Sequence, residues 1–550
     1  MLTSSYWPAD TSQPVWRMTA GDALRRSASL AGECTALVEI MPQGMSSLTG
    51  ANSTNRRWTY TQLLADAEAC AGLLLSKFDP GTSICLWAPN VPEWVIIQYG
   101  AALAGMVLVT ANPSLRSEEL DHILDRSGAR ALFHVDAFRG TDMAALAEKV
   151  GGACLQRLRI HNFDAALEPF RGEISLPEVA FDAPAQLQFT SGTTGHPKGA
   201  LLHHYGLVTN AAFVGARTRE DGDVIVTPMP LFHTAGSVLS VLTSAVSLST
   251  LVLPVMFDPA LMLDTIESEK ATKTSGVPTM LAAMIDEQAA RPRDLSTLRV
   301  IASGGSPVAP ELLARAERAF GCPLVSVYGQ TELSPVVCAT DIADEVEDRA
   351  STSGRPLPQV EIRIAEPLTG ETLPIGQEGE IQARGYQTML EYIGEPDATA
   401  ATLLADGWLR TGDLGTMDSR GFVRVTGRLS DMIIRGGENI YPAEIEAALL
   451  RHAAVAEVAV FGVPDEYWGE TVAAALRFKM GFSQPTADEM KRHCRSLLSP
   501  QKTPARWYVV EAFPMTSSGK IKKFALAEQF GDPLQPVEPD TAASEQGISR

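Results

Sequence analysis

The sequence lacks the features of a secreted or zinc-stabilised protein. Its seven cysteines are scattered and form no CxxC pair, so their spacing suits neither a disulfide framework nor a zinc site. The N-terminal stretch MLTSSYWPAD has polar and acidic residues and Pro where a signal peptide needs a basic start and an apolar run. We therefore expect a cytoplasmic chain in a reducing compartment.

Positive charge is also scarce. The net charge of −20 argues against nucleic acid or an anionic membrane as the main partner, although a local basic pocket for a nucleotide is still allowed. One run, Ala235–Phe257, is uncharged over 23 residues and is long enough to cross a bilayer. Because it also holds seven Ser or Thr residues and a Pro, a buried helix followed by a buried strand at Leu251–Leu253 is the better interpretation. We expect no transmembrane segment.

A chain of 550 residues is too long for one hydrophobic core, so two or more domains are expected. Strand-like and helical patterns alternate through the first four hundred residues, which predicts an α/β fold with largely parallel sheets covered by helices. The predicted strands are Ser83–Ala88, Arg130–Val135, Gln186–Phe189, Val224–Thr227, Thr250–Leu253, Arg299–Ala302 and Leu324–Val327. The clearest predicted helices are Tyr60–Lys77, Pro92–Gly105 and Pro310–Phe320. Gly-rich loops at strand ends lie where ligands bind in such folds.

After about Arg428 the pattern changes to that of a small α+β domain. A Gly-Gly loop is followed by a helix, two strands, another helix and a last strand. We expect a large domain over residues 1–429, a small C-terminal domain over residues 430–530, and a disordered acidic tail over residues 531–550.

The stretch FTSGTTGHPKGA, Phe189–Ala200, has the composition of a phosphate-binding loop. Glycine allows the backbone to approach phosphate closely, and Lys198 supplies a point charge. It is not a Walker loop, because Pro197 stands where that pattern needs Gly and Gly199 stands where it needs Ser or Thr. A plain Gly/Thr surface turn is the alternative.

Three further strand ends and turns carry polar groups. In VYGQTELS, Glu332 is a candidate Mg²⁺ ligand, Thr331 a phosphate donor and Tyr328 a ring that stacks on a base, although an acidic residue is also common at a helix N-terminus. ASGGSP, Ala302–Pro307, suits close approach by a flat ring. In GWLRTGDLG, Asp413 has two oxygens for the hydroxyls of a ribose, or is an ordinary turn residue.

In order and spacing, these motifs resemble the acyl- and aryl-CoA synthetases of the adenylate-forming superfamily, which includes firefly luciferase and peptide-synthetase adenylation domains. The resemblance runs from about Trp58 to Phe524, and it is strongest with medium-chain fatty acyl-CoA synthetases. NVPEWVIIQYGAALAGMVLVTANPSLRSEEL, QFTSGTTGHPKGA and DMIIRGGENIYPAEIE carry that closer likeness.

The resemblance implies roles for individual residues. ATP phosphates would be held by Thr190, Ser191, Gly192, Thr193, Thr194, Gly195 and Lys198. The rest of the nucleotide would contact Gly304, Gly305, Ser306, Tyr328, Gly329, Gln330, Thr331, Asp413 and Arg428, with Mg²⁺ on Glu332. Lys520 would contact the carboxylate and α-phosphate during adenylation, and His233 would lie near the acyl carboxylate. Phe232, Gly436, Gly437 and Glu438 would lie along the path of CoA, and Ser430 would be the hinge, where relatives often carry Asp or Lys.

The implied function is ATP-dependent activation of an apolar carboxylic acid, with a medium-chain fatty acid as the favoured substrate. Acyl-AMP and pyrophosphate form first, and CoA then releases AMP and gives acyl-CoA. Three alternatives are a CoA ligase for an aryl or branched acid, an enzyme that loads a separate carrier protein, and a nucleotide sensor with a degenerate site. The last is disfavoured because every charged position named above is present. A homodimer is left open.

Overall fold

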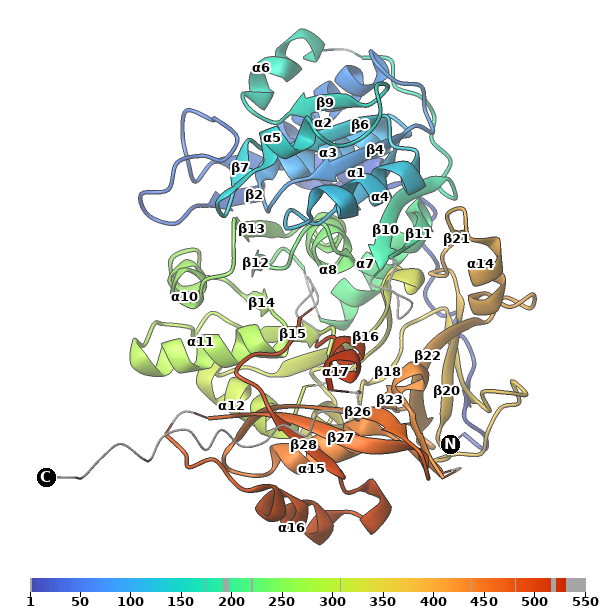
Figure 1. Ribbon diagram of the computed structural model, residues 1–550. Coiled ribbons are helices and arrows are strands. Elements are labelled where there is room, and N and C mark those ends of the chain that lie inside the picture. The colour runs from blue at the N-terminus through green and yellow to red at the C-terminus, as the bar shows by residue number, and fades with distance from the viewer. Residues whose placement is uncertain are drawn as a thin grey trace, which may run out of the picture. The chain divides into compact units, whose positions relative to one another are not determined.

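The computed structural model describes residues 2–172, 174–190, 197–218, 221–306, 308–436, 438–479, 481–515 and 521–530. The chain folds as two compact units, Met1–Val425 and Thr426–Arg550. The larger unit contains three sheets of five or more strands and a two-stranded ribbon, β7 (Ala137–Phe138) with β8 (Thr141–Asp142). Helices lie beside the two largest sheets (Figure 1).

The first large sheet has seven strands, and the predicted phosphate loop connects two of them, β10 and β11. Its inner strands are parallel, and an antiparallel hairpin and a short strand extend one side. In spatial order the strands are β21 (Glu391–Tyr392), β11 (Lys198–His203), β10 (Pro184–Thr190), β5 (Val107–Ala111), β4 (Ser83–Trp87), β6 (Ala131–His134) and β9 (Gln156–Arg159).

The second large sheet has nine strands, and six of them form a continuous parallel array. Antiparallel strands close both edges. The order is β18 (Arg355–Pro356), β17 (Val336–Ala339), β16 (Leu324–Gly329), β15 (Val300–Gly304), β14 (Lys273–Ser275), β12 (Val224–Val226), β13 (Thr250–Pro254), β2 (Thr35–Ile40) and β3 (Arg57–Thr59). The prediction of an α/β fold with largely parallel sheets is confirmed.

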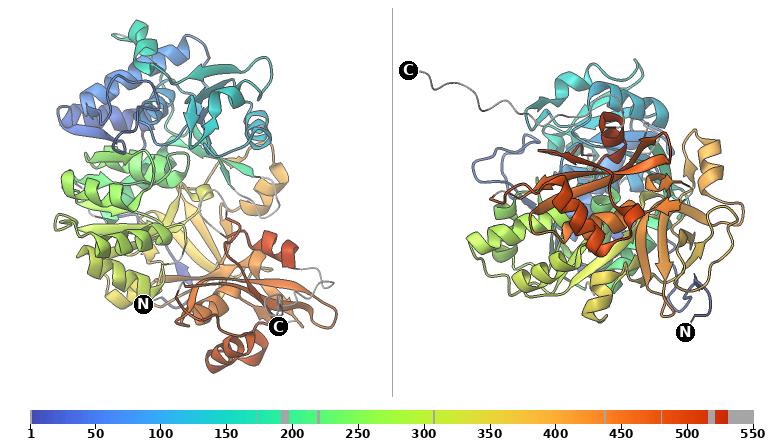
Figure 2. Two further views of the ribbon diagram at one scale, coloured as in Figure 1. Left: turned by 60° about the vertical axis from the view of Figure 1, so that its left-hand side comes forward. Right: turned by 60° about the horizontal axis from the view of Figure 1, so that its bottom comes forward.

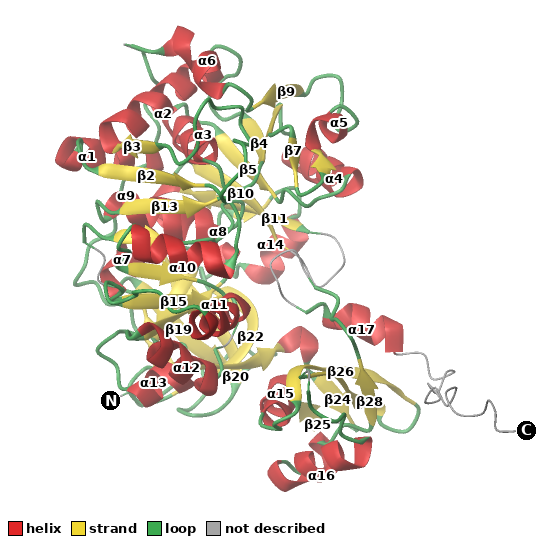
Figure 3. Cartoon of the chain, turned by 90° about the vertical axis from the view of Figure 1, so that its left-hand side faces the viewer, coloured by secondary structure: helices red, strands yellow, loops and turns green. Residues whose placement is uncertain are grey.

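A group of helices packs together, and Figures 2 and 3 show helices lying beside these sheets. The group comprises α1 (Ala20–Ala31), α2 (Tyr60–Leu75), α3 (Pro92–Leu103), α7 (His204–Arg217) and α9 (Thr243–Val246). All residues of α3 are buried, as expected of a helix that is apolar on nearly every side. A second core between the nine-stranded sheet and its outer helices includes Ile301, Leu313 and Leu324. Those helices are α10 (Pro259–Ser268), α11 (Pro278–Ala290) and α12 (Pro310–Phe320).

The uncharged run after His233 is folded as predicted, into buried helix and then buried strand. It comprises α8 (Thr234–Gly236), a π-helix at Ser237–Leu242, α9 and strand β13. The sequence pattern does not predict the wider π-turn. Among the described residues, no helix has the length and apolar content needed to cross a membrane.

A third sheet of five strands completes the larger unit and carries Asp413 on β22 (Leu409–Met417). Its other strands are β1 (Tyr6–Trp7), β19 (Val360–Ala365), β20 (Gly379–Gly385) and β23 (Val423–Arg428).

The smaller unit is an α+β fold of the kind predicted. Its sheet contains β25 (Glu438–Ile440), β24 (Ile433–Arg435), β27 (Gly469–Phe478), β26 (Val455–Asp465) and β28 (Arg506–Val509). Its helices are α15 (Pro442–Leu450), α16 (Ala487–Leu497) and α17 (Lys523–Phe530). Ile445, Val460 and Leu476 lie in its core.

Candidate active site

Two neighbouring parallel strands, β15 and β16, end beside each other and bring two predicted motifs together. Gly304 pairs with Val327, so the glycine turn lies next to Tyr328. A Cβ at position 304 would lie 2.6 Å from Val327 Cγ2, so only glycine lets the strands approach this closely. Gly305 and Ser306 are exposed beyond the strand end. The carboxyl edge of a parallel sheet is the usual ligand site in this architecture.

Tyr328 and Asp413, which are far apart in the sequence, meet at this edge. The Tyr328 Oη donates to Asp413 Oδ2 at 2.9 Å. Burial, and next the Asp413 carboxylate, raise the pKa of Tyr328 well above its usual value, so the phenol stays protonated and remains a donor. Asp413 is only 5% exposed, and its backbone N–H donates to Thr411 Oγ1 at 3.0 Å. This carboxylate is therefore oriented by the protein alone.

Glu332 follows β16, in a short 3-10 helix at Thr331–Leu333. Thr331 and Glu332 are both buried. The chain doubles back here, since a Cβ on Gly329 would overlap the carbonyl oxygen of Pro335. Gln330 precedes the helix and is half-buried. This tight reversal holds the Glu332 carboxylate at the strand end.

Tyr392, on β21, joins Glu332 to Lys198. Its Oη donates to Glu332 Oε1 at 2.7 Å, and the Lys198 Nζ lies 5.3 Å from the centroid of its ring. Burial and the neighbouring carboxylate raise the pKa of Tyr392 far above its usual value, so this phenol is also a permanent donor. Sequence reasoning missed Tyr392. Its only signal was an aromatic residue in a short strand-like run, EYI.

The ends of the predicted phosphate loop are held as a hairpin. Thr190 pairs with Lys198 in the antiparallel β10–β11 ladder, and Thr190 Oγ1 donates to the Lys198 carbonyl at 3.4 Å. The predicted phosphate ligands between them lie outside the described residues: Ser191, Gly192, Thr193, Thr194 and Gly195. The hairpin fixes where that loop starts and where its lysine emerges.

His233 lies at the N-cap of α8, beside the half-buried Phe232. Its Nδ1 accepts from the backbone N–H of Ala235 at 3.3 Å. With Nδ1 as an acceptor, the neutral imidazole carries its proton on Nε2, which makes Nε2 a donor suited to a carboxylate. Asn90 fixes the preceding turn, because its Oδ1 accepts from Leu231 N at 3.0 Å.

The smaller unit presents its predicted site residues differently. Arg428 and Ser430 are exposed, and Ser430 Oγ donates to Asp431 Oδ1 at 3.2 Å. Gly436 N donates to the Trp468 carbonyl at 2.8 Å. Glu438 begins strand β25. Gly437 and Lys520 lie outside the described residues.

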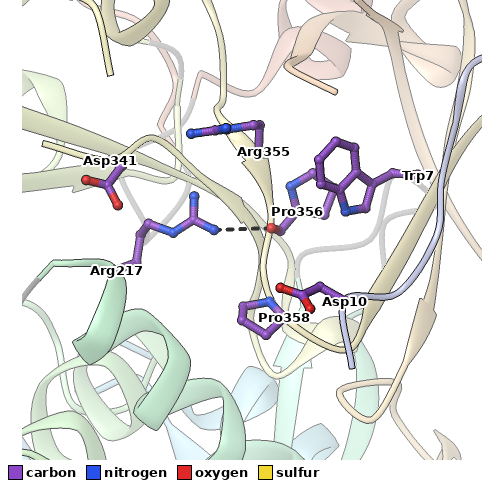
Figure 4. Close-up of a pocket in the computed structure, with 7 residues that line it drawn as sticks. All are labelled: Trp7, Asp10, Arg217, Asp341, Arg355, Pro356 and Pro358. Carbon is purple, nitrogen blue, oxygen red and sulfur yellow. Dashed lines mark hydrogen bonds between the residues drawn. The ribbon is translucent and has the colours of Figure 1, made fainter. Parts of the chain in front are cut away.

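A cavity of about 280 Å³ in the larger unit is lined by none of the predicted site residues (Figure 4). Its two guanidinium groups are matched by two carboxylates, so the cavity offers no excess positive charge to a phosphate. The lining residues are Trp7, Asp10, Arg217, Asp341, Arg355, Pro356 and Pro358.

No group of three or more His, Cys, Asp or Glu residues that could form a metal cage is found in the described parts of the chain. Glu332 nevertheless fits Mg²⁺, because this ion is commonly bound through one or two carboxylates together with substrate phosphates and water. Glu332 offers one such carboxylate at the end of β16.

Comparison with known proteins gives matches to both units. Residues 25–393 match the family described as AMP-binding enzyme, and residues 444–520 match the AMP-binding enzyme C-terminal domain. A Bacillus subtilis (strain 168) protein named as a putative acyl-CoA synthetase, YngI, is 38% identical over 512 residues, covering 86% of this chain and 92% of that protein.

Two further relatives agree with this. The mitochondrial medium-chain acyl-CoA ligase ACSF2 of Macaca fascicularis is 35% identical over 568 residues, covering 96% of this chain and 89% of that protein. The crystal structure of ATP-bound MatB from Rhodopseudomonas palustris is 26% identical, with a TM-score of 0.83, covering 94% of this chain and 99% of that one.

Proposed function

The chain belongs to the AMP-binding enzyme family, and on this premise we propose that it is an AMP-forming acid–CoA ligase acting on an apolar, medium-chain carboxylic acid. The names of its relatives support the ligase chemistry. One arrangement carries the assignment to this site. Tyr392 donates to Glu332, and its ring lies beside Lys198. Tyr328, near the end of the strand that Glu332 follows, donates to Asp413.

In the first half-reaction, a carboxylate oxygen of the acid attacks the α-phosphorus of ATP. The bond from that phosphorus to the bridging oxygen breaks, and pyrophosphate leaves. The carboxylate is already a nucleophile, so the protein positions the reactants and neutralises charge rather than removing a proton. His233 Nε2–H is a donor to the acid, and Lys198 is a counter-charge for the β- and γ-phosphates.

The nucleoside is held by the Tyr328–Asp413 corner. The Asp413 carboxylate accepts from the ribose hydroxyls, and the adenine lies between the Tyr328 ring and the turn at Gly304–Ser306. Glu332 would hold Mg²⁺, which neutralises phosphate charge when bound. Tyr392 orients Glu332 through its hydrogen bond.

In the second half-reaction, the thiol of CoA gives its proton to water and its sulfur attacks the acyl carbon. The bond from that carbon to the phosphate oxygen of AMP breaks, and AMP leaves. Lys520 serves adenylation only, and Ser430 is the hinge about which the smaller unit turns between the two steps. Gly436, Gly437 and Glu438 lie on the pantetheine path, with Phe232 as its gate. The seven cysteines are free thiols, which supports a reducing compartment such as the cytoplasm.

The test is acid-dependent exchange of labelled pyrophosphate into ATP, followed by addition of CoA. Exchange followed by release of AMP and acyl-CoA is the expected result. Exchange without CoA turnover would indicate an enzyme that loads a carrier protein, and no exchange with any acid would indicate a sensor. A panel of fatty, branched and aromatic acids in the same assay distinguishes the substrate classes.

A further inference from the structure

A buried polar cluster lies behind His233, in a region that otherwise forms the core. Gln186 and Gln188, on β10, donate through Nε2 to Ser237 Oγ at 3.0 and 3.2 Å. Ser237 Oγ in turn donates to the carbonyl of His233 at 3.2 Å. The two glutamines are each 2% exposed, and Ser237 is fully buried. The hydroxyl uses its donor and both acceptor positions in these three bonds.

The cluster is anchored from a second element. Gln98, on the fully buried helix α3, donates through Nε2 to the carbonyl of Ser237 at 2.9 Å. Ser237 is also the first residue of the π-helix, a geometry that is rare and is often found at functional sites. Both the side chain and the backbone of Ser237 are therefore fixed from outside its own helix.

The cluster connects two parts of the proposed site. Strand β10 continues from Gln188 to Thr190, where the predicted phosphate loop begins. The His233 carbonyl is thus tied, through one hydroxyl, to the strand that leads into that loop. Three buried amides and a hydroxyl are costly in a core, all the more because the Gln98 Oε1 has no hydrogen-bond partner among the described residues, and apolar side chains would fill the same space more cheaply. A positioning role explains why polar groups are used.

We propose that Ser237, with Gln186 and Gln188, is a positioning residue for adenylation. The cluster holds the His233 backbone at a set distance from β10, and so sets the acid carboxylate against the phosphates. This inference rests on the proposed function. Its effect reaches the reaction only through His233, because Ser237 itself is buried.

The experiment compares two serines of the same π-helix. Ser240 is 2% exposed, and its Oγ donates to the Ala235 carbonyl at 2.9 Å, in the turn before the π-helix rather than on β10. Ser237→Ala and Ser240→Ala thus each remove one buried hydroxyl bonded to a carbonyl of the preceding turn. Each is made in the wild-type chain and with His233→Ala, and acid-dependent pyrophosphate exchange and the melting temperature are measured.

We expect Ser237→Ala to lower kcat/KM for the acid about tenfold, since small misplacements of reacting groups are costly. KM for ATP should stay within about twofold of wild type for both serine variants, and the loss in kcat/KM for Ser240→Ala, whose hydroxyl does not bond to β10, should be clearly smaller than that for Ser237→Ala. With His233→Ala, the Ser237 substitution should cause no additional loss. Should Ser237→Ala fail to fold, Gln188→Met takes its place in the same cycle, with a smaller loss because Gln186 still donates.

Equal losses for the two serines, or the same Ser237 loss with and without His233, would overturn the positioning role. Absence of acid-dependent exchange in the wild-type chain would instead overturn the proposed function, and the inference with it.

Discussion

Several predicted site residues of the two units differ in how far they are exposed. In the larger unit, Asp413, Thr331 and Glu332 are 5%, 7% and 8% exposed, and phenol groups orient both carboxylates. In the smaller unit, Arg428 and Ser430 are exposed to solvent. A buried, hydrogen-bonded set is organised before ligands arrive, which is how electrostatic stabilisation is obtained at little cost during the reaction.

This difference suggests a division of labour. Under the proposed function, Glu332 and Asp413 of the larger unit would serve the nucleotide, whereas Lys520 of the smaller unit would act in adenylation only. Substitutions in the two units should therefore affect the half-reactions differently. Substitutions in the smaller unit should slow one half-reaction and spare the other. Substitutions of Glu332 or Tyr392 should slow adenylation and raise the Mg²⁺ concentration that it needs.

The largest expected effect is that of Lys520→Ala in the smaller unit. Loss of one charge-assisted donor costs about 3–4 kcal/mol, so adenylation should slow by roughly 10² to 10³. Thioester formation from supplied acyl-AMP should be nearly unchanged. Pyrophosphate exchange and single-turnover thioester assays measure the two steps. Lys522→Ala, two residues away, is the matched control. Equal losses in both steps would contradict the one-step role of Lys520.

Ser430→Pro should have the opposite effect: it should slow thioester formation and spare adenylation. Pro fixes its own φ and disfavours the helical region for the residue before it, and Leu429 lies in the 3-10 helix Leu429–Asp431. Strain of ~3 kcal/mol would slow CoA turnover about 10²-fold. Pyrophosphate exchange should survive. Ser430→Ala is the control. Unchanged overall turnover would place the hinge elsewhere.

Within the larger unit, Glu332→Gln should slow adenylation by about 10²-fold, as expected when one preorganised electrostatic contact is lost. The amide keeps the size of the side chain but removes its charge, so the Mg²⁺ concentration at half-maximal rate should rise. Glu395→Gln is the control, since Glu395 follows Tyr392 closely and pairs with Arg126 at 3.8 Å instead. An unchanged Mg²⁺ dependence would show that Glu332 is not the metal ligand.

The Glu332–Tyr392 pair shows what the sequence does and does not predict. Helix α12 begins and ends as expected, because Pro310 stands at its first turn and Gly321 ends it in the left-handed region. Parallel strands also follow from apolar runs between helices. Tyr392, however, gains its role from a partner 60 residues away, and no local pattern records such a contact.

The π-helix is a similar case. Its residues, SVLSVL, have the pattern of an ordinary buried helix, whereas its first residue, Ser237, is hydrogen-bonded to α3 and β10, which lie far from it in the sequence. Tyr328 and Asp413 can be recognised from their motifs, but their mutual hydrogen bond cannot. Motifs therefore identify the residues of a site, whereas contacts between elements far apart in the sequence determine how those side chains are oriented.

Tyr392→Phe tests one such contact. The ring beside Lys198 is retained, so the substitution removes only the hydroxyl that donates to Glu332. Residues that orient a metal ligand typically contribute 10–100-fold, and we expect a loss of about tenfold in adenylation with a raised Mg²⁺ requirement. Tyr386→Phe is the control, because its phenol bonds to Asn210 instead. If Tyr392→Phe had no effect beyond that of Tyr386→Phe, the hydroxyl would have no part in orienting Glu332.

The smallest expected effect is that of adding one methylene group to the substrate. The segments expected near the acyl tail are His233–Leu248, Gly276–Ile285 and Ser334–Cys338, and they contain no Asp, Glu, Lys or Arg. Each CH₂ moved from water into an apolar pocket contributes about 0.8 kcal/mol, or roughly fourfold in kcat/KM. Efficiency should therefore rise from C4 upward, level off where the pocket ends and then fall.

The hydroxyl groups in these segments determine whether the acyl pocket also favours a polar group on the acid. Ser240 and Thr243 donate to carbonyls of the preceding turn, Ala235 and Val238, so they make no demand on a substrate tail. Thr234 Oγ1 and Ser334 Oγ are buried and have no hydrogen-bond partner among the described residues. If either hydroxyl lines the acyl pocket, a hydroxylated acid would have a higher kcat/KM than the unsubstituted acid of the same length, because an unpaired buried hydroxyl gains most from a polar partner. A C2–C16 series run beside hydroxylated, aromatic and dicarboxylic acids measures this. Flat efficiency, or preference for any of those acids, would overturn the fatty-acid assignment and leave the ligase chemistry intact.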